Sequence, residues 1–220
     1  PPLPSPIGWK GTRIFNQNLE FLVRPTGTRP GVVLLMLEGL ASGRVEMFDE
    51  TGKVLQSREL TAKGKQFQPV SLTINPAGGR YYRVRLTSPD AMAWHVQHDA
   101  ATQITLYSPE AKNLDNLYPR AYGFLKPGTQ EIYVRYEAVG EGFHTVTLYD
   151  PNGNVAAAAE QFVDLDDKGR YEVELKFKVP PDAGQGWSLE VFDSEILEIK
   201  GFEPFWADSP EELFSPEIHL

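Results

Sequence analysis

Residues 45–54 read Val45-Glu46-Met47-Phe48-Asp49-Glu50-Thr51-Gly52-Lys53-Val54, and residues 146–155 read Val146-Thr147-Leu148-Tyr149-Asp150-Pro151-Asn152-Gly153-Asn154-Val155. The two segments align without a gap at an offset of 101 residues (146 − 45). In each segment an apolar strand pattern leads into Asp at the first position and Gly at the fourth position of a turn, the preferences of a type I turn. The repeat predicts a tandem duplication of one β-domain.

A second pair of similar segments lies further along the chain. Tyr107-Ser108-Pro109-Glu110 resembles Phe214-Ser215-Pro216-Glu217 at an offset of 107 residues (214 − 107), which predicts about six extra residues in the second copy. We therefore expect a proline-rich linker over residues 1–12, a first domain over 13–110 and a second domain over 111–220.

Length and composition agree with two folded domains. The chain has 220 residues, 41% of them hydrophobic and 23% charged, so each half can bury a core of its own. No apolar run is long enough for a membrane span, and the absence of cysteine excludes a disulfide framework. The proline-rich start has neither the charged nor the apolar segment of a signal peptide, and we expect the chain to be a piece of a larger protein.

Charge is divided unevenly between the halves. Residues 1–110 carry 12 Lys and Arg against 9 Asp and Glu, whereas residues 111–220 carry 9 against 21. An acidic chain without a basic run does not predict nucleic acid or an anionic membrane as a partner. The asymmetry indicates either two differently solvated surfaces or an attraction between the halves.

Strand patterns recur through both halves. In residues 171–179, five apolar residues alternate with Glu and Lys, which is typical of a strand with one buried face. Tyr82, Val84 and Leu86 are expected to point inward in the first half, as are Trp187, Leu189 and Val191 in the second. The run Val32 to Leu37 predicts a strand covered on both faces. We expect an all-β protein of two antiparallel, jelly-roll-like β-sandwiches, with helix limited to a turn or two.

Metal and catalytic motifs are weak or missing. Asp164, Asp166 and Asp167 place carboxylates in one acidic loop, a candidate calcium site that lacks the later Glu of an EF-hand loop. The Asp-Gly turns offer a calcium loop as the alternative to a plain hairpin. His95 and His98 are three apart on an expected strand and so face opposite sides. The sequence contains no nucleophile elbow, phosphate-binding loop or dinucleotide fingerprint.

Outward aromatic residues beside guanidinium groups are the main candidates for ligand binding. A planar ring offers an apolar face to a sugar and can hold one polar group of it. The alternation places Tyr81 and Arg83 outward in the first half and Tyr133 and Arg135 outward in the second. Trp94 and Trp206 are expected near turns. These six residues form the predicted glycan-binding set, with packing between domains as the alternative interpretation.

The closing segment Gly79-Arg80-Tyr81-Tyr82-Arg83-Val84, together with the strand and turn of residues 45–52, resembles the bacterial pre-peptidase C-terminal domain and related β-sandwich accessory modules of secreted enzymes. The second copy has Gly186-Trp187-Ser188-Leu189-Glu190-Val191 instead at its close. The resemblance implies a non-catalytic module of a secreted or periplasmic bacterial protein.

Three hypotheses follow. The first is a carbohydrate-binding accessory module without a cofactor, whose partners are a polysaccharide and the other domains of its parent protein. The second is a structural or protein-binding spacer. The third is a polysaccharide-active enzyme that uses a pair of carboxyl groups about 5–10 Å apart.

Overall fold

The structure is a computed structural model and describes residues 10–14, 18–64, 69–76, 80–89, 93–109, 120–164 and 169–216. The chain divides into two compact units, which are described one at a time. Unit 1 contains residues 1–107 and 215–220, and unit 2 contains residues 108–214. The described residues form β-strands joined by turns, so the prediction of an all-β chain with antiparallel sheets is confirmed. In the part of the chain described, no helix is long and apolar enough to cross a membrane.

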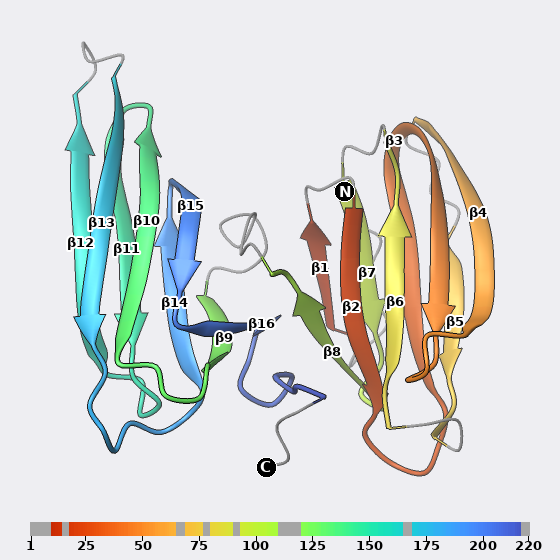
Figure 1. Cartoon of the computed structure of the whole chain (residues 1–220). Coiled ribbons are helices and arrows are strands. Elements are labelled where there is room, and N and C mark those ends of the chain that lie inside the picture. Colours follow the sequence, from red (N-terminus) through yellow and green to blue (C-terminus); the bar gives the residue numbers. More distant parts are fainter. Residues whose placement is uncertain are drawn as a thin grey trace. The chain divides into compact units, whose positions relative to one another are not determined.

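Within the described residues, unit 1 has eight strands, which pair in two antiparallel groups (Figure 1). The strands are β1 (Lys10–Ile14), β2 (Asn18–Pro25), β3 (Gly31–Phe48), β4 (Val54–Gly64), β5 (Val70–Ile74), β6 (Tyr82–Thr87), β7 (Ala93–His98) and β8 (Thr102–Tyr107). The first part of β3 pairs with β5 and β7, and β7 also pairs with β1. The second part of β3 pairs with β4 and β6, followed by β2 and β8. One 18-residue strand therefore belongs to both sheets.

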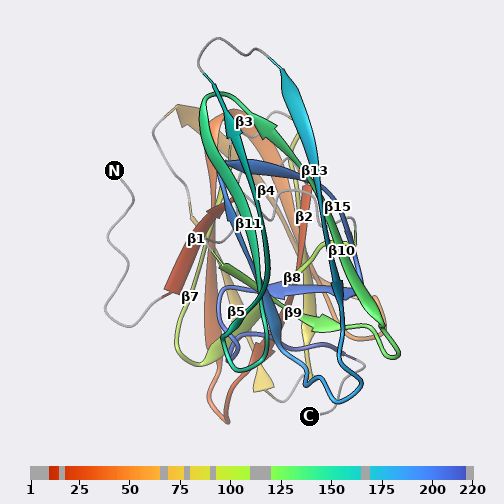
Figure 2. The ribbon, with the colours of Figure 1, turned by 90° about the vertical axis from the view of Figure 1, so that its left-hand side faces the viewer.

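Unit 2 has a corresponding set of strands. They are β9 (Arg120–Leu125), β10 (Glu131–Val139), β11 (Gly142–Tyr149), β12 (Val155–Val163), β13 (Arg170–Lys178), β14 (Trp187–Phe192), β15 (Ser194–Lys200) and β16 (Phe202–Ala207). One sheet has the order β16-β9-β14-β11-β12. The other has the order β13-β10-β15, and these three strands lie side by side in Figure 2.

The pairing partners show which strands correspond. β10 and β11 take the places of the two parts of β3, β9 that of β2, β14 that of β6, and β16 that of β8. Because β16 ends at Ala207, the counterpart of Tyr107 lies near that residue and not at Phe214. The expected gain of six residues is therefore wrong. Ser209-Pro210-Glu211 matches Ser108-Pro109-Glu110 at the same offset of 101 as the central repeat (209 − 108).

The cores follow the predicted alternation. Tyr82, Val84 and Leu86 are buried in β6, and Trp187 and Leu189 are buried in β14. The run Val32 to Leu37 is covered on both faces only at its end, where Met36 and Leu37 are both buried; at its start Val32 and Leu34 are half-buried whereas Val33 and Leu35 are fully buried. Strand β1 begins at Lys10, inside the stretch expected to be a linker, and residues 1–9 lie outside the described residues.

The two repeated turns have the same construction. The Asp49 carboxylate accepts hydrogen bonds from the backbone N–H groups of Thr51 (2.9 Å) and Lys53 (3.0 Å). The Asp150 carboxylate accepts those of Asn152 and Asn154 at 2.9 Å each. These bonds close hairpins, so the turn interpretation is confirmed. A register shift follows in both copies, between Met47 and Phe48 and between Leu148 and Tyr149.

The units differ where the chain passes from one sheet to the other. Unit 1 crosses within the continuous strand β3, whereas unit 2 interrupts the strand at Gly140-Glu141. The buried imidazole of His144 holds this interruption in place. Its Nε2 lies 3.0 Å from the carbonyl oxygen of Gly140, and its Nδ1 faces the carbonyl oxygen of Asp193. His144 therefore ties two chain reversals together.

Candidate ligand-binding face

Trp94 and Trp206 are core residues and do not present a ring to a ligand. Trp94 is 0% exposed and lies in β7 opposite Ile14 and Leu37. Trp206 is 1% exposed and lies in β16 opposite Gly123, with its ring 4.9 Å from that of Phe202. Both residues lie near strand ends, as expected, but they fill inward positions of their strands and are buried.

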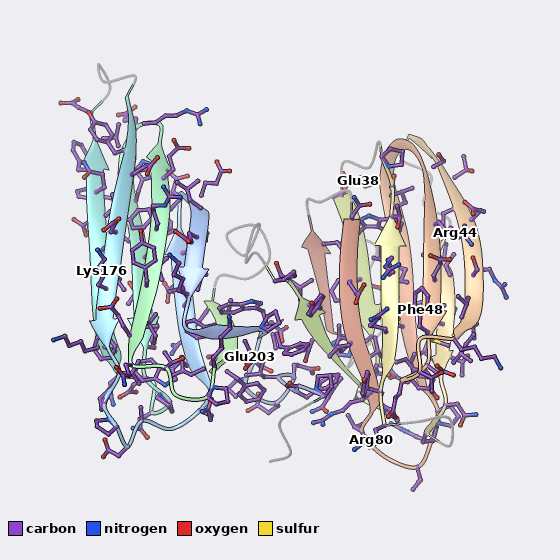
Figure 3. All side chains as sticks on the ribbon, in the orientation of Figure 1. Glu38, Arg44, Phe48, Arg80, Lys176 and Glu203 are labelled. Atoms are coloured by element: carbon purple, nitrogen blue, oxygen red, sulfur yellow. The ribbon has the colours of Figure 1, made fainter. Side chains whose placement is uncertain are left out.

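Tyr81 and Arg83 lie at the start of β6, where Tyr81 is half-buried. The Arg83 guanidinium lies 3.2 Å from the Glu20 carboxylate and 5.5 Å from the centroid of the Phe48 ring, which Figure 3 labels. The same carboxylate also accepts hydrogen bonds from Arg85, at 3.2 Å. Arg83 therefore takes part in an internal ion-pair cluster, and its charge is already compensated.

Tyr133 lies on the outward side of the sheet formed by β13, β10 and β15. Its hydroxyl donates to Glu174 at 2.8 Å, and this bond raises the pKa of the Tyr133 phenol. The ammonium groups of Lys176 and Lys200 lie over its ring, 5.4 and 5.0 Å from the centroid (Lys176 is labelled in Figure 3). Lysines from both neighbouring strands thus contact the ring that was predicted to receive a sugar.

Arg135 is the next outward residue of β10. It pairs with Glu172 of β13 at 3.0 Å and lies 3.8 Å from Glu198 of β15. Lys176 donates to Glu174 at 2.8 Å, which raises the pKa of the Lys176 ammonium, and the same bond is the main reason that the pKa of Glu174 is lowered. This sheet face carries ion pairs both within and between strands, which is typical of a solvated surface.

The predicted calcium loop is described only in part. Asp164 is exposed at the end of β12, whereas Asp166 and Asp167 lie outside the described residues. Within the ranges that the structure describes, no group of three or more His, Asp or Glu side chains could hold a metal ion. In the Asp-Gly turns, backbone N–H groups occupy one carboxylate oxygen, Oδ1, of Asp49 and of Asp150.

Another face of unit 2 carries exposed aromatic side chains. We call the outward side of β9, β14, β11 and β12 the aromatic face. Phe143, Phe162 and Phe192 are 54%, 51% and 60% exposed there. Phe143 and Phe162 are cross-strand partners with ring centroids 4.8 Å apart, and Phe192 faces Thr145 on the other side of β11. The outward side of a sheet is normally polar, so three large apolar rings at such positions call for a ligand or partner.

The same face carries a stacked arginine toward β9. The Arg120 guanidinium lies 3.7 Å from the centroid of the Tyr149 ring and 5.4 Å from that of Tyr122, and its Nε donates to Ser188 at 2.8 Å. The Tyr149 hydroxyl donates to Glu190 at 2.9 Å, which raises the pKa of the Tyr149 phenol. Aromatic rings, one guanidinium and one carboxylate thus share a single sheet face.

The sequence reasoning missed this face, although the signal was present. Tyr149 stands in the repeated segment itself, and Phe143 has the same alternation phase as Tyr149. The exposed rings come from three strands that pairing brings together, and only the register shows that Phe143 and Phe162 are neighbours.

Comparisons with known proteins show a distant likeness to solved structures. No protein-family model matches the chain, and no curated protein matches it either. Among solved structures, the N-terminal CBM22-1-CBM22-2 tandem domain from Paenibacillus barcinonensis Xyn10C is similar, with a TM-score of 0.23 and 10% sequence identity. The match covers 88% of this chain and 79% of that chain. A TM-score of this size identifies neither a ligand nor a site.

Proposed function

We propose that this chain is a non-catalytic carbohydrate-binding accessory region, and that the glycan lies on the aromatic face of unit 2. The observation that carries the proposal is the exposure of Phe143, Phe162 and Phe192 on one sheet face, each by more than half of its surface. Phenyl rings bind the C–H faces of sugars by burial of apolar area. The neighbouring Thr145 and the Glu190 carboxylate supply hydrogen-bonding groups beside the rings.

The proposal differs from the sequence-based hypothesis in its residues. A platform built on Trp94 and Trp206 would require both rings to leave the core, which costs several kcal/mol each. The three phenylalanines are already exposed, so a ligand could contact them without rearrangement of the sheet. We take both units as jelly-roll-like modules of a secreted or periplasmic bacterial protein, connected to other domains of it.

The experiment is a binding screen of the intact chain against insoluble and soluble polysaccharides, followed by titration calorimetry of each hit. Replacement of Phe143, Phe162 and Phe192 by Ala should weaken binding by roughly tenfold or more, since burial of one such ring contributes about 1.5–3 kcal/mol. Leu55→Ala is the matched control, because Leu55 is also an exposed apolar residue, at 43%, but lies in unit 1. Retention of full affinity by the triple variant, or the absence of any hit, would refute the proposal.

A protein-binding spacer is the second candidate, and one observation favours it. The rings of Phe143 and Phe162 are tilted by 53° to each other, so they do not form one flat platform for a sugar chain. A tilted pair suits an irregular protein surface better. The spacer interpretation holds if the unaltered chain binds no glycan and the triple variant has altered binding to the other domains of the parent protein.

A further inference from the structure

We propose that Arg120 is the receptor for a carboxylate, and that the glycan bound by the aromatic face is therefore an acidic polysaccharide whose sugars are uronic acids. This inference rests on the proposed function and specifies its ligand class. It is drawn from the guanidinium stacked on Tyr149 and from a comparison with the matching place in unit 1.

The Arg120 side chain is held in a defined orientation. Its guanidinium stacks on the Tyr149 ring at 3.7 Å, and Nε is fixed by the hydrogen bond to Ser188 at 2.8 Å. A planar guanidinium held in this way loses little further conformational freedom when it binds a ligand. This favours bidentate contact with a planar carboxylate. The arginine is preorganised for such a ligand.

The terminal amino groups of Arg120 remain available. Among the residues that the structure describes, the only hydrogen-bond acceptor of this side chain is Ser188, through Nε, and no carboxylate lies within ion-pair distance. Glu190 is its cross-strand partner in register, but the Glu190 carboxylate accepts the Tyr149 hydroxyl instead. The half-buried guanidinium therefore offers two donors on its outer edge.

Unit 1 contains the same arrangement with a carboxylate already bound to the guanidinium. Strand β2 corresponds to β9, and β6 corresponds to β14. Glu20 therefore stands at the position of Arg120, and Arg85 stands at the position of Glu190. The acidic and the basic residue have exchanged strands. Arg85 lies 5.2 Å from the centroid of the Phe48 ring, the counterpart of Tyr149, and donates through Nε and Nη2 to Glu20 at 3.2 Å. In unit 1 a carboxylate of the chain itself occupies the outer edge of the stacked guanidinium.

The comparison indicates the chemistry of the missing group in unit 2. A carboxylate fits beside a guanidinium stacked on an aromatic ring at this place in the fold, because Glu20 already does so.

Residues 111–220 carry an excess of acidic groups, which opposes the approach of a polyanion at low ionic strength. Such long-range repulsion is screened beyond about 8 Å at physiological salt, whereas the direct contact of a partly buried guanidinium is screened much less. We expect binding of an acidic glycan to strengthen, or stay constant, as salt is raised to that level.

The test is titration calorimetry of the full chain with oligogalacturonate, oligoglucuronate and oligomannuronate. The expected result is binding of at least one of them, with a loss of about 10- to 100-fold when its carboxylates are methyl-esterified. The ester comparison uses the unaltered protein, so it does not depend on the folding of any variant. Equal affinity of acid and ester would overturn the inference.

Two variants place the contact at Arg120. Arg120→Ala should lose about 10- to 100-fold in affinity for the acid, and Arg120→Lys should also lose most of it because an ammonium lacks the bidentate fork. Arg85→Ala is the matched control and should leave the affinity unchanged, because its partner is Glu20. Full affinity in Arg120→Lys would refute the bidentate contact.

The outcomes separate this inference from the proposed function. Binding of a neutral glycan that requires the three phenylalanines but not Arg120 would overturn the uronic acid inference and leave the carbohydrate-binding function standing. Equal or tighter binding of a sulfated glycan that lacks carboxylates would show recognition of anions in general and would also overturn the commitment to a carboxylate. No binding of any glycan would overturn both.

Discussion

Gly123 of β9 lies directly opposite Trp206 of β16, and a Cβ atom built on Gly123 would be 2.9 Å from the indole ring. On the other side of β9, Gly123 faces Trp187. The absence of a side chain therefore lets the rings of Trp206 and Phe202 approach the backbone of β9 closely. Gly123→Ala should destabilise unit 2 by about 1–3 kcal/mol, because the close packing leaves no space for a methyl group.

The measurement is urea unfolding followed by tryptophan fluorescence, which reports on the rings of Trp187 and Trp206. Gly27→Ala is the control, since a Cβ atom at Gly27 meets nothing within 4 Å, and its effect should stay within a few tenths of a kcal/mol. If the Gly123→Ala protein is as stable as the parent, the close approach is not needed.

Trp94→Ala should destabilise unit 1 by about 3–5 kcal/mol, because removal of a fully buried indole leaves a cavity. Trp94→Phe should cost less, since most of the ring volume is kept. Both variants are compared by thermal and urea unfolding. A small cost for Trp94→Ala, together with direct loss of glycan affinity in a folded protein, would restore Trp94 as a ligand-binding residue.

The repeated turns should make stability depend on acid pH. Hydrogen bonds from Thr51 to Asp49 and from Asn154 to Asp150 lower the pKa of each carboxyl group below its ordinary value of 3.8. A lowered folded-state pKa gives stability that is present above the unfolded-state pKa and is lost as pH falls through the folded-state pKa. The stability advantage over Asp150→Ala should therefore be full at pH 7 and should shrink as the pH falls below the ordinary carboxyl pKa of 3.8.

Urea midpoints of the parent and of Asp150→Ala across this pH range provide the measurement. Asp150→Asn is the matched variant: its amide oxygen can still accept a backbone N–H, but it carries no charge that titrates. It should fall between the other two at pH 7. A constant difference between the parent and Asp150→Ala from pH 7 to pH 2 would contradict the assigned hydrogen bonds.

Gly153→Ala should destabilise the second hairpin by about 1 kcal/mol, because the residue has a φ of 83° and L side chains rarely adopt this conformation. No atom lies within 4 Å of the position of the added Cβ, so crowding contributes nothing. Gly153→Asn should cost less, since Asn tolerates the left-handed region. Equal costs for the Ala and Asn variants would show that the backbone conformation is not the cause.

The sequence supported the fold well because duplication and alternation are local signals. The repeat of Asp49 to Gly52 as Asp150 to Gly153 predicted two equivalent hairpins, and the alternation in residues 171–179 predicted β13 and its half-covered face. The prediction of six extra residues in the second copy was wrong because Ser-Pro-Glu occurs three times in the chain. Only the end of β16 shows which of the three corresponds to Ser108.

The candidate site was harder to predict because it depends on pairing. Alternation placed Tyr133 and Arg135 outward correctly, but could not show that lysines and glutamates from both neighbouring strands contact them. Trp94 and Trp206 were misplaced because a large aromatic residue near a turn signal can equally lie at the inward end of a strand. The stacking of Arg120 on Tyr149 joins residues 29 positions apart (149 − 120) and is visible only in the register.

The continuity of β3 has a consequence for how each unit opens. In unit 1 a single uninterrupted backbone carries hydrogen bonds of both sheets, so one sheet cannot peel away without pulling on the ladder of the other. In unit 2 the corresponding strands meet at Gly140-Glu141, where the left-handed φ of Gly140 (93°) turns the chain. Native-state hydrogen exchange should therefore give nearly uniform protection along β3 but two distinct levels for β10 and β11. Unit 1 should thus open as a whole, whereas unit 2 should open in stages.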